Sequence, residues 1–108
     1  MAILVISYED MVRDLRPVVD KIIRFCEIKI SDAQVEALMP TFTFKHMKAN
    51  KDKFQPVSVG WKKGYDFLRK GKVGDHKQLL QPNHHKQFND MLATDFPTGT
   101  PPFLRLLL

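Results

Sequence analysis

Ala2–Ser7, AILVIS, is the stretch that sets the expected fold class. It is an unbroken run of aliphatic and β-branched residues, a pattern typical of a strand buried on both faces of a sheet. Such a strand needs neighbours, because an unpaired apolar strand is prone to aggregate. The rest of the sequence offers one candidate partner, the short tail Phe103–Leu108. We therefore expect an α/β protein whose central sheet lies mainly upstream of this chain.

Helical patterns dominate the residues that follow. A first helix is expected to begin at Pro17, with an apolar face made of Val19, Ile22, Ile23 and Cys26. Its cysteine is then a core thiol. A second helix is expected to open at Ser31, where Gln34 completes a capping box, and to stop at Pro40.

A basic and irregular region follows the second helix. Thr43 is a suitable N-cap for a short basic helix, and from Lys51 to Gly74 the periodicity disappears among glycines and lysines. We expect a long loop there, and then a last helix that begins near Pro82. Its apolar face would consist of Phe88, Met91 and Leu92.

Bulk composition fits an ordinary globular chain. Its 108 residues are 44% hydrophobic and 27% charged, enough for one small domain or a piece of a larger one. A single cysteine excludes an internal disulfide and fits a reducing compartment. No run is apolar enough to cross a bilayer, so we expect no membrane partner and a cytoplasmic location.

Positive charge is concentrated in one segment. Residues 45–77 contain ten Lys or Arg and three Asp, which leaves the rest of the chain slightly acidic although the total is +5. Such a field attracts phosphate, sulfate, nucleic acid or an acidic membrane surface. A solvated basic face is an equally good interpretation of charge alone.

The most specific segment is Phe67–Lys77, FLRKGKVGDHK. Arg69 offers a planar fork that suits bidentate phosphate binding, and Lys70 adds a second positive charge. Gly71 and Gly74 can adopt positive φ and let backbone N–H groups approach an anion. This turn is a candidate phosphate clamp, although basic glycine loops are common.

Three segments together resemble the cytosolic sulfotransferase family. Residues 69–77 are similar to its RKGxxGDWK signature, Ser7–Met11 (SYEDM) to its YEDM, and Thr43–Asn50 (TFKHMKAN) to its SFxxMKxN. They occur in the family's order and spacing. The resemblance implies that residues 1–108 are the C-terminal part of one P-loop-like, three-layer α/β domain, mostly helical with one leading strand and a long basic loop.

The resemblance also implies a site for the sulfate donor 3′-phosphoadenosine 5′-phosphosulfate (PAPS) and its product adenosine 3′,5′-bisphosphate (PAP). Arg69, Lys70 and the backbone of Gly71 would hold the 3′-phosphate. The adenine would lie against Phe44 and contact Tyr8, in a pocket that Thr43 and Met47 line. Aromatic faces suit a purine, although Phe44 and Met47 are also ordinary core residues at helical spacing.

Departures from the family pattern limit what is carried over. Phe42 stands where the family often has Thr, and His76 stands where it usually has Trp. The dimer motif KxxxTVxxxE survives only as Lys77, with Gln81, Pro82 and Lys86 at its other positions. The family's dimer is therefore not carried over to this chain, and the sequence leaves its oligomeric state open.

The family's phosphosulfate loop, general-base histidine and second 3′-phosphate pair do not occur in this sequence. We expect no catalytic residue here, no metal ligand, and no sulfuryl transfer by the isolated chain. His84 and His85 point to different sides of a helix and make a poor metal pair. The intact enzyme would sulfate a small-molecule hydroxyl or amine, with an N-terminal half complementing this one and no nucleic acid involved.

Two other interpretations remain open at this stage. One is a non-catalytic basic module that binds nucleic acid or polyanions through residues 45–77, with the steep salt dependence of such binding. The other is an incomplete remnant with no specific ligand. A donor site would bind a nucleotide with a 3′-phosphate more tightly than one without it, whereas a general polyanion binder would show little preference.

Overall fold

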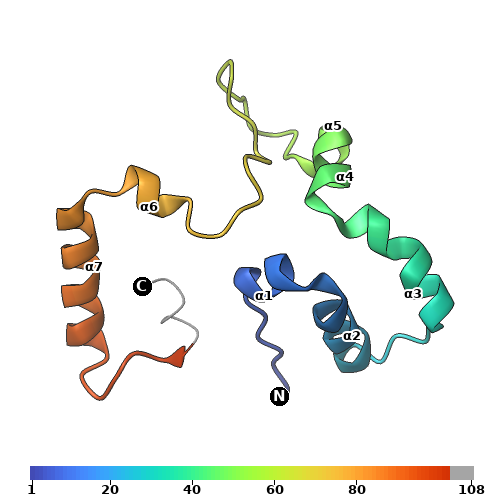
Figure 1. Cartoon of the computed structure of the whole chain (residues 1–108), viewed down its shortest axis with the longest axis horizontal. Coiled ribbons are helices and arrows are strands. Elements are labelled where there is room, and N and C mark those ends of the chain that lie inside the picture. The colour runs from blue at the N-terminus through green and yellow to red at the C-terminus, as the bar shows by residue number, and fades with distance from the viewer. Residues whose placement is uncertain (103–108) are drawn as a thin grey trace.

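The computed structural model describes residues 1–102 as a series of short helices without a strand (Figure 1). In chain order the elements are α1 (Tyr8–Arg13), α2 (Leu15–Phe25), α3 (Asp32–Leu38), the 3-10 helix η1 (Met39–Phe42), α4 (Phe44–Ala49), α5 (Lys51–Phe54), α6 (His76–Leu79) and α7 (Pro82–Asp95). The expected mostly helical character is confirmed. No helix within residues 1–102 is long and apolar enough to cross a membrane.

The leading strand expected at Ala2–Ser7 is wrong for this structure. Residues 1–7 belong to no helix or strand, and Ile3 and Val5 are 72% and 70% exposed. A strand exists only where a second segment accepts and donates its backbone hydrogen bonds, and residues 8–102 contain no such segment. The candidate partner Phe103–Leu108 lies outside the described residues, and the α/β class is not seen within residues 1–102.

Helices α1 and α2 form a consecutive pair. The Ser7 hydroxyl caps α1 by accepting the Asp10 N–H at 3.1 Å, and α2 begins at Leu15, two residues before the expected start at Pro17. Proline is tolerated there because first-turn N–H groups have no partner within the helix. Val18 is 3% exposed and anchors α2. Cys26 is exposed at the helix end, so the expected core thiol is wrong.

Helix α3 has the capping box that its sequence predicts. Ser31 Oγ accepts the Gln34 N–H at 3.3 Å, while Gln34 Oε1 accepts the Ser31 N–H at 2.9 Å. Val35 on the next turn is 3% exposed. The chain does not leave the helix abruptly at Pro40, because Met39–Phe42 continue as η1.

Arg16 joins α2 to α3 through three carboxylates. Its Nε donates to Asp20 at 3.0 Å, and its guanidinium also pairs with Asp32 at 3.3 Å and with Glu36. The hydrogen bond with Asp20 raises the pKa of Arg16 above its ordinary value. This junction fixes the angle between two helices that carry one buried valine each.

The basic region is more helical at its start than the sequence predicts. Thr43 caps α4 as expected, since its Oγ1 accepts the His46 N–H at 3.2 Å. Lys51–Phe54 form the extra turn α5 where an irregular chain was expected. Residues 55–75 are then free of helix or strand, and α7 begins at Pro82 as expected.

The described part of the chain buries few side chains. Only Val18, Val35 and Leu92 are buried among its hydrophobic residues. Figure 1 shows α3–α5 on one side, α6 and α7 on the other, and α1 and α2 between them. The radius of gyration is 17.8 Å, against about 13 Å for a compact domain of this size. The helices are therefore held by local caps and a few junctions more than by a common core.

Candidate functional site

A cleft lies where α1, α4 and the segment before α6 meet. Its volume is about 730 Å³, within the range of about 300–1,000 Å³ that is typical of ligand pockets. The residues that line it are Tyr8, Met11, Val12, Leu15, Phe42, Thr43, Phe44, Met47, Phe67, Leu68, Arg69, Lys70, Gly71, Lys72 and Asp75. Both apolar and charged side chains therefore line the cleft.

Every residue that the sequence predicts for nucleotide binding lies in this cleft. Tyr8 is the first residue of α1, Phe44 and Met47 belong to α4, Thr43 is its N-cap, and the other three are in the loop: Arg69, Lys70 and Gly71. These positions are far apart in the sequence and come from three separate segments. The structure thus brings together all seven of the residues singled out from the sequence.

Gly71 lies directly against the Phe44 ring. Its φ is +63°, and a Cβ built on it would lie 2.5, 2.7 and 2.8 Å from three ring carbons. Carbon atoms in contact are normally about 3.5–4.0 Å apart, so only glycine allows this approach. The loop backbone and the aromatic ring therefore form one continuous wall of the cleft.

The two cations of the loop converge on one carboxylate. Lys70 Nζ lies 2.7 Å from Asp75 Oδ1, and the Arg69 guanidinium pairs with Asp75 Oδ2. The Asp75 side chain is 16% exposed, whereas those of Arg69 and Lys70 are about half exposed. The charge of this partly buried carboxylate is therefore well compensated by two cations. This arrangement also shows that both cations can reach one anionic group.

The Thr43 hydroxyl is committed to the backbone. It donates to the Pro40 carbonyl oxygen at 2.9 Å while it accepts the His46 N–H. Its single proton is therefore not available to a ligand in this conformation. Thr43 therefore lines the cleft and caps α4. Tyr8 also lines the cleft and is 45% exposed, so it is accessible to a ligand.

Sequence reasoning missed two charged residues of this region. Asp75 lies within Phe67–Lys77, six residues after Arg69, and this spacing across two glycines is the signal that could have found it. Lys48 is the second residue and lies on α4. Its Nζ donates to the Arg69 carbonyl oxygen at 2.7 Å and lies 5.6 Å from the Phe44 ring centroid.

None of the histidines lines the cleft, and each makes contacts elsewhere. His84 Nδ1 accepts the Gln81 N–H at 3.0 Å and so caps α7. The rings of His76 and His85 lie 6.1 Å apart, and that of His46 packs edge-on against Phe54. Residues 1–102 contain no group of three or more His, Cys, Asp or Glu that could hold a metal ion.

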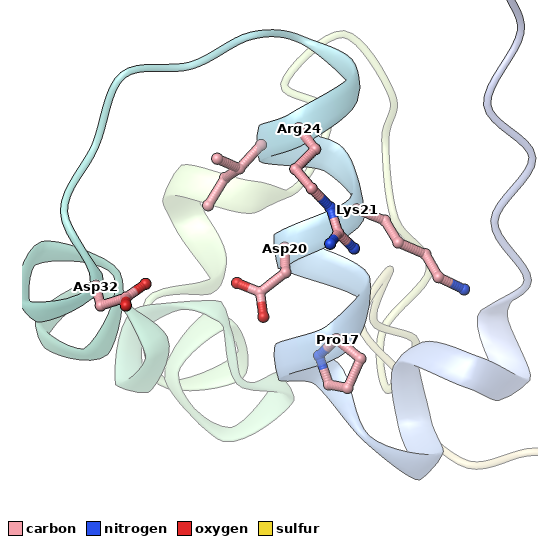
Figure 2. Close-up of a pocket in the computed structure, with 6 residues that line it drawn as sticks. Pro17, Asp20, Lys21, Arg24 and Asp32 are labelled. Atoms are coloured by element: carbon pink, nitrogen blue, oxygen red, sulfur yellow. The ribbon is translucent and has the colours of Figure 1, made fainter.

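A second pocket of about 390 Å³ lies beside the α2–α3 junction and is separate from the cleft. Figure 2 shows Asp20 of α2 and Asp32 of α3 on facing sides of it. Both carboxylates are already paired with Arg16. The pocket contains none of the seven residues that the sequence predicts for nucleotide binding.

Comparison with known proteins identifies the family. Residues 1–97 match the sulfotransferase domain. The chain is 31% identical over 103 residues to the 3-beta-hydroxysteroid sulfotransferase of Cavia porcellus, an alignment that covers 94% of this chain and 36% of that protein. It is 35% identical over 103 residues to the amine sulfotransferase of Oryctolagus cuniculus, which covers 88% of this chain and 34% of that protein.

The chain therefore spans about a third of the length of these relatives. No solved structure matches it. The family match extends over nearly all of the described residues and includes the whole of the cleft. On these grounds the chain belongs to the sulfotransferase family.

Proposed function

We propose that this chain forms the adenine and 3′-phosphate side of the PAPS site of a sulfotransferase. In the intact enzyme the sulfuryl group would pass from PAPS to the hydroxyl or amine of a small-molecule acceptor, and PAP would remain. One observation carries the proposal: the seven residues that the family resemblance assigns to the nucleotide line a single cleft. Membership of the family supports the same reaction class.

The residues of the cleft suit each part of this nucleotide. Phe44 and Tyr8 offer aromatic faces for the purine. Arg69 and Lys70 offer a guanidinium and an ammonium for a phosphate dianion. The close approach of Gly71 to the Phe44 ring keeps the loop near the adenine side of the site. The cleft is large enough for a nucleotide.

In this proposal the Asp75 carboxylate occupies the place that the 3′-phosphate takes when the nucleotide binds. Without a ligand, this carboxylate pairs with both cations. A 3′-phosphate would replace the carboxylate as partner of Arg69 and Lys70, because a dianion with three oxygens can accept hydrogen bonds from both at once. The carboxylate and the phosphate would repel each other, so Asp75 lowers the affinity that the cations would otherwise provide.

The acceptor and the catalytic groups belong to the rest of the enzyme in this proposal. The names of two relatives refer to a steroid hydroxyl and to an amine, and both are small-molecule acceptors. No histidine of this chain lines the cleft, so we assign no general base and expect no sulfuryl transfer by the chain alone. A complementing N-terminal part would supply the phosphosulfate loop. We expect the enzyme to act in the cytoplasm.

The test is calorimetric titration of the 108-residue chain with PAP and with adenosine 5′-monophosphate, each at two salt concentrations. We expect a preference for PAP that Arg69→Ala reduces by about tenfold or more, because a hydrogen bond to a charged group contributes about 1.5–3 kcal/mol. Arg24→Ala is the matched control, since Arg24 is exposed and lies outside this cleft.

Two results would contradict the proposal. Equal affinity for both nucleotides would show that the 3′-phosphate is not recognised. An equal loss of affinity for PAP and for adenosine 5′-monophosphate in Arg69→Ala, together with a steep salt dependence, would instead indicate a general polyanion binder of residues 45–77.

A further inference from the structure

We propose that Lys48 is a positioning residue that ties the Arg69–Gly71 loop to helix α4 and thereby sets the shape of the nucleotide cleft. The consequence for ligand binding depends on the function proposed above, but the tie itself does not. Lys48 does not line the cleft. It acts through the two cleft elements that it joins.

The helix places Lys48 correctly for this role. Phe44 and Lys48 are four residues apart on α4 and therefore project from the same face. The ammonium lies 5.6 Å from the centroid of the Phe44 ring, within the range of a cation–π contact. From there it reaches across to the loop and donates to the Arg69 carbonyl oxygen at 2.7 Å.

This hydrogen bond fixes a peptide plane at the centre of the candidate phosphate loop. The carbonyl carbon of Arg69 and the nitrogen of Lys70 share that plane, so holding its oxygen restricts ψ of Arg69 and φ of Lys70. The side chains of these two residues then leave the backbone from set positions. The bound oxygen is also an acceptor that would repel a phosphate, and Lys48 compensates its partial negative charge.

A second contact two residues later completes the arrangement. Gly71 lies on the Phe44 ring, so the loop meets α4 both at Arg69 and at Gly71. Two contacts within three residues constrain the loop far more than either alone, since a single contact leaves it free to pivot. The Lys48 tether and the Gly71–Phe44 contact should therefore form and break together.

Lys45 shows that a lysine on α4 need not have this role. It is exposed on the same helix, carries the same charge, and lies within the same basic segment. Within residues 1–102, the Lys45 side chain makes no hydrogen bond, ion pair or ring contact. It is therefore a matched control for the removal of one positive charge near the cleft.

The first measurement is the nuclear magnetic resonance spectrum of the 108-residue chain without ligand. Protons above an aromatic face are shifted upfield by the ring current, so the Gly71 α protons should be shifted by Phe44. Lys48→Met keeps the apolar stem over the ring and removes the donor. We expect it to abolish the upfield shift, while Lys45→Met leaves it in place and Lys48→Arg, which keeps a charged donor, retains most of it.

The second measurement is the affinity of the same variants for PAP and adenosine 5′-monophosphate. Lys48→Met should lower the affinity for PAP by about tenfold, as expected for one hydrogen bond with a charged donor. Affinity for the monophosphate should fall less, because it lacks the group that the loop would hold. Lys45→Met should cost at most about twofold for either, as a distant screened charge does.

Different results would overturn different claims. If Gly71 keeps its upfield shift in Lys48→Met, or has none in the unaltered chain, the tether is refuted. If the shift disappears but the preference for PAP is unchanged, the positioning role is refuted. If the unaltered chain has no preference for PAP, the proposed function fails, and the Gly71 signal still decides whether Lys48 holds the loop.

Discussion

Gly71→Ala tests the wall of the cleft where loop and ring meet. The substitution adds one methyl group at a position with φ of +63°, where the new Cβ would lie 2.5–2.8 Å from three carbons of Phe44. Two penalties therefore act on it. One comes from the backbone conformation, and the other comes from the overlap with the ring.

The two penalties have different sizes and can be separated. A left-handed conformation costs a residue with a Cβ about 1–2 kcal/mol. The overlap requires the surfaces to separate by roughly 1 Å to regain normal contact, and such overpacking costs about 1–3 kcal/mol. Because the loop is at the surface, it should relieve the overlap by moving off the ring, which would disturb both the adenine and the phosphate contacts.

The assay is calorimetric titration with PAP, combined with urea unfolding of each variant. Gly71→Ala should weaken binding by at least about tenfold, or 1.4 kcal/mol. Gly64→Ala and Gly74→Ala are matched controls, since φ is +85° at Gly64 and +78° at Gly74. A Cβ added at Gly64 would have no atom within 4 Å, and one added at Gly74 would have its nearest atom at 3.9 Å. They bear the conformational penalty without the overlap.

A double-mutant cycle with Phe44→Ala gives the sharpest refutation. Without the ring, Gly71→Ala should cost only the conformational penalty, so the coupling between the two sites should be about 1–3 kcal/mol. Coupling near zero would refute the contact. Equal losses for all three glycine variants would show that backbone strain alone decides the outcome.

Two further substitutions test the charge balance and the helix ends. Asp75→Asn should raise the affinity for PAP about threefold or more at low salt, because it frees Arg69 and Lys70 from their carboxylate partner; a lower affinity in the titration would show that Asp75 mainly orients the cations. Ser31→Ala should destabilise the chain by about 1 kcal/mol in urea unfolding, since it removes one half of the α3 capping box. Ser58→Ala, at an exposed loop position, should leave the unfolding curve unchanged.

Local features of the fold followed from short stretches of sequence. The capping box at Ser31, the cap at Thr43 and the helix start at Pro82 all occur where the sequence predicts them. Each depends on groups within four residues of one another, so neighbouring residues determine it. The exception at Lys51–Phe54 is a single helical turn with no apolar periodicity to reveal it.

The expected strand failed for the opposite reason. Ala2–Ser7 has the composition of a buried strand, but strand formation depends on hydrogen bonds from a second segment, which residues 8–102 do not supply. The prediction that Cys26 is a core thiol was wrong for a similar reason. Its spacing continues the apolar face of α2, yet Cys26 lies at the end of that helix and is exposed. Both errors concern burial, which a segment cannot achieve alone.

For the candidate site, the sequence by itself determined the chemistry and the tertiary structure decided the partners. The family resemblance was enough to select seven of the fifteen residues that line the cleft. It did not reveal that Asp75 pairs with both Arg69 and Lys70, or that Lys48 binds the Arg69 carbonyl group. The approach of Gly71 to Phe44 was equally hidden. The contacts of Lys48 with Arg69 and of Phe44 with Gly71 join helix α4 to a distant loop, so they depend on how the two segments pack and not on the order of residues within either one.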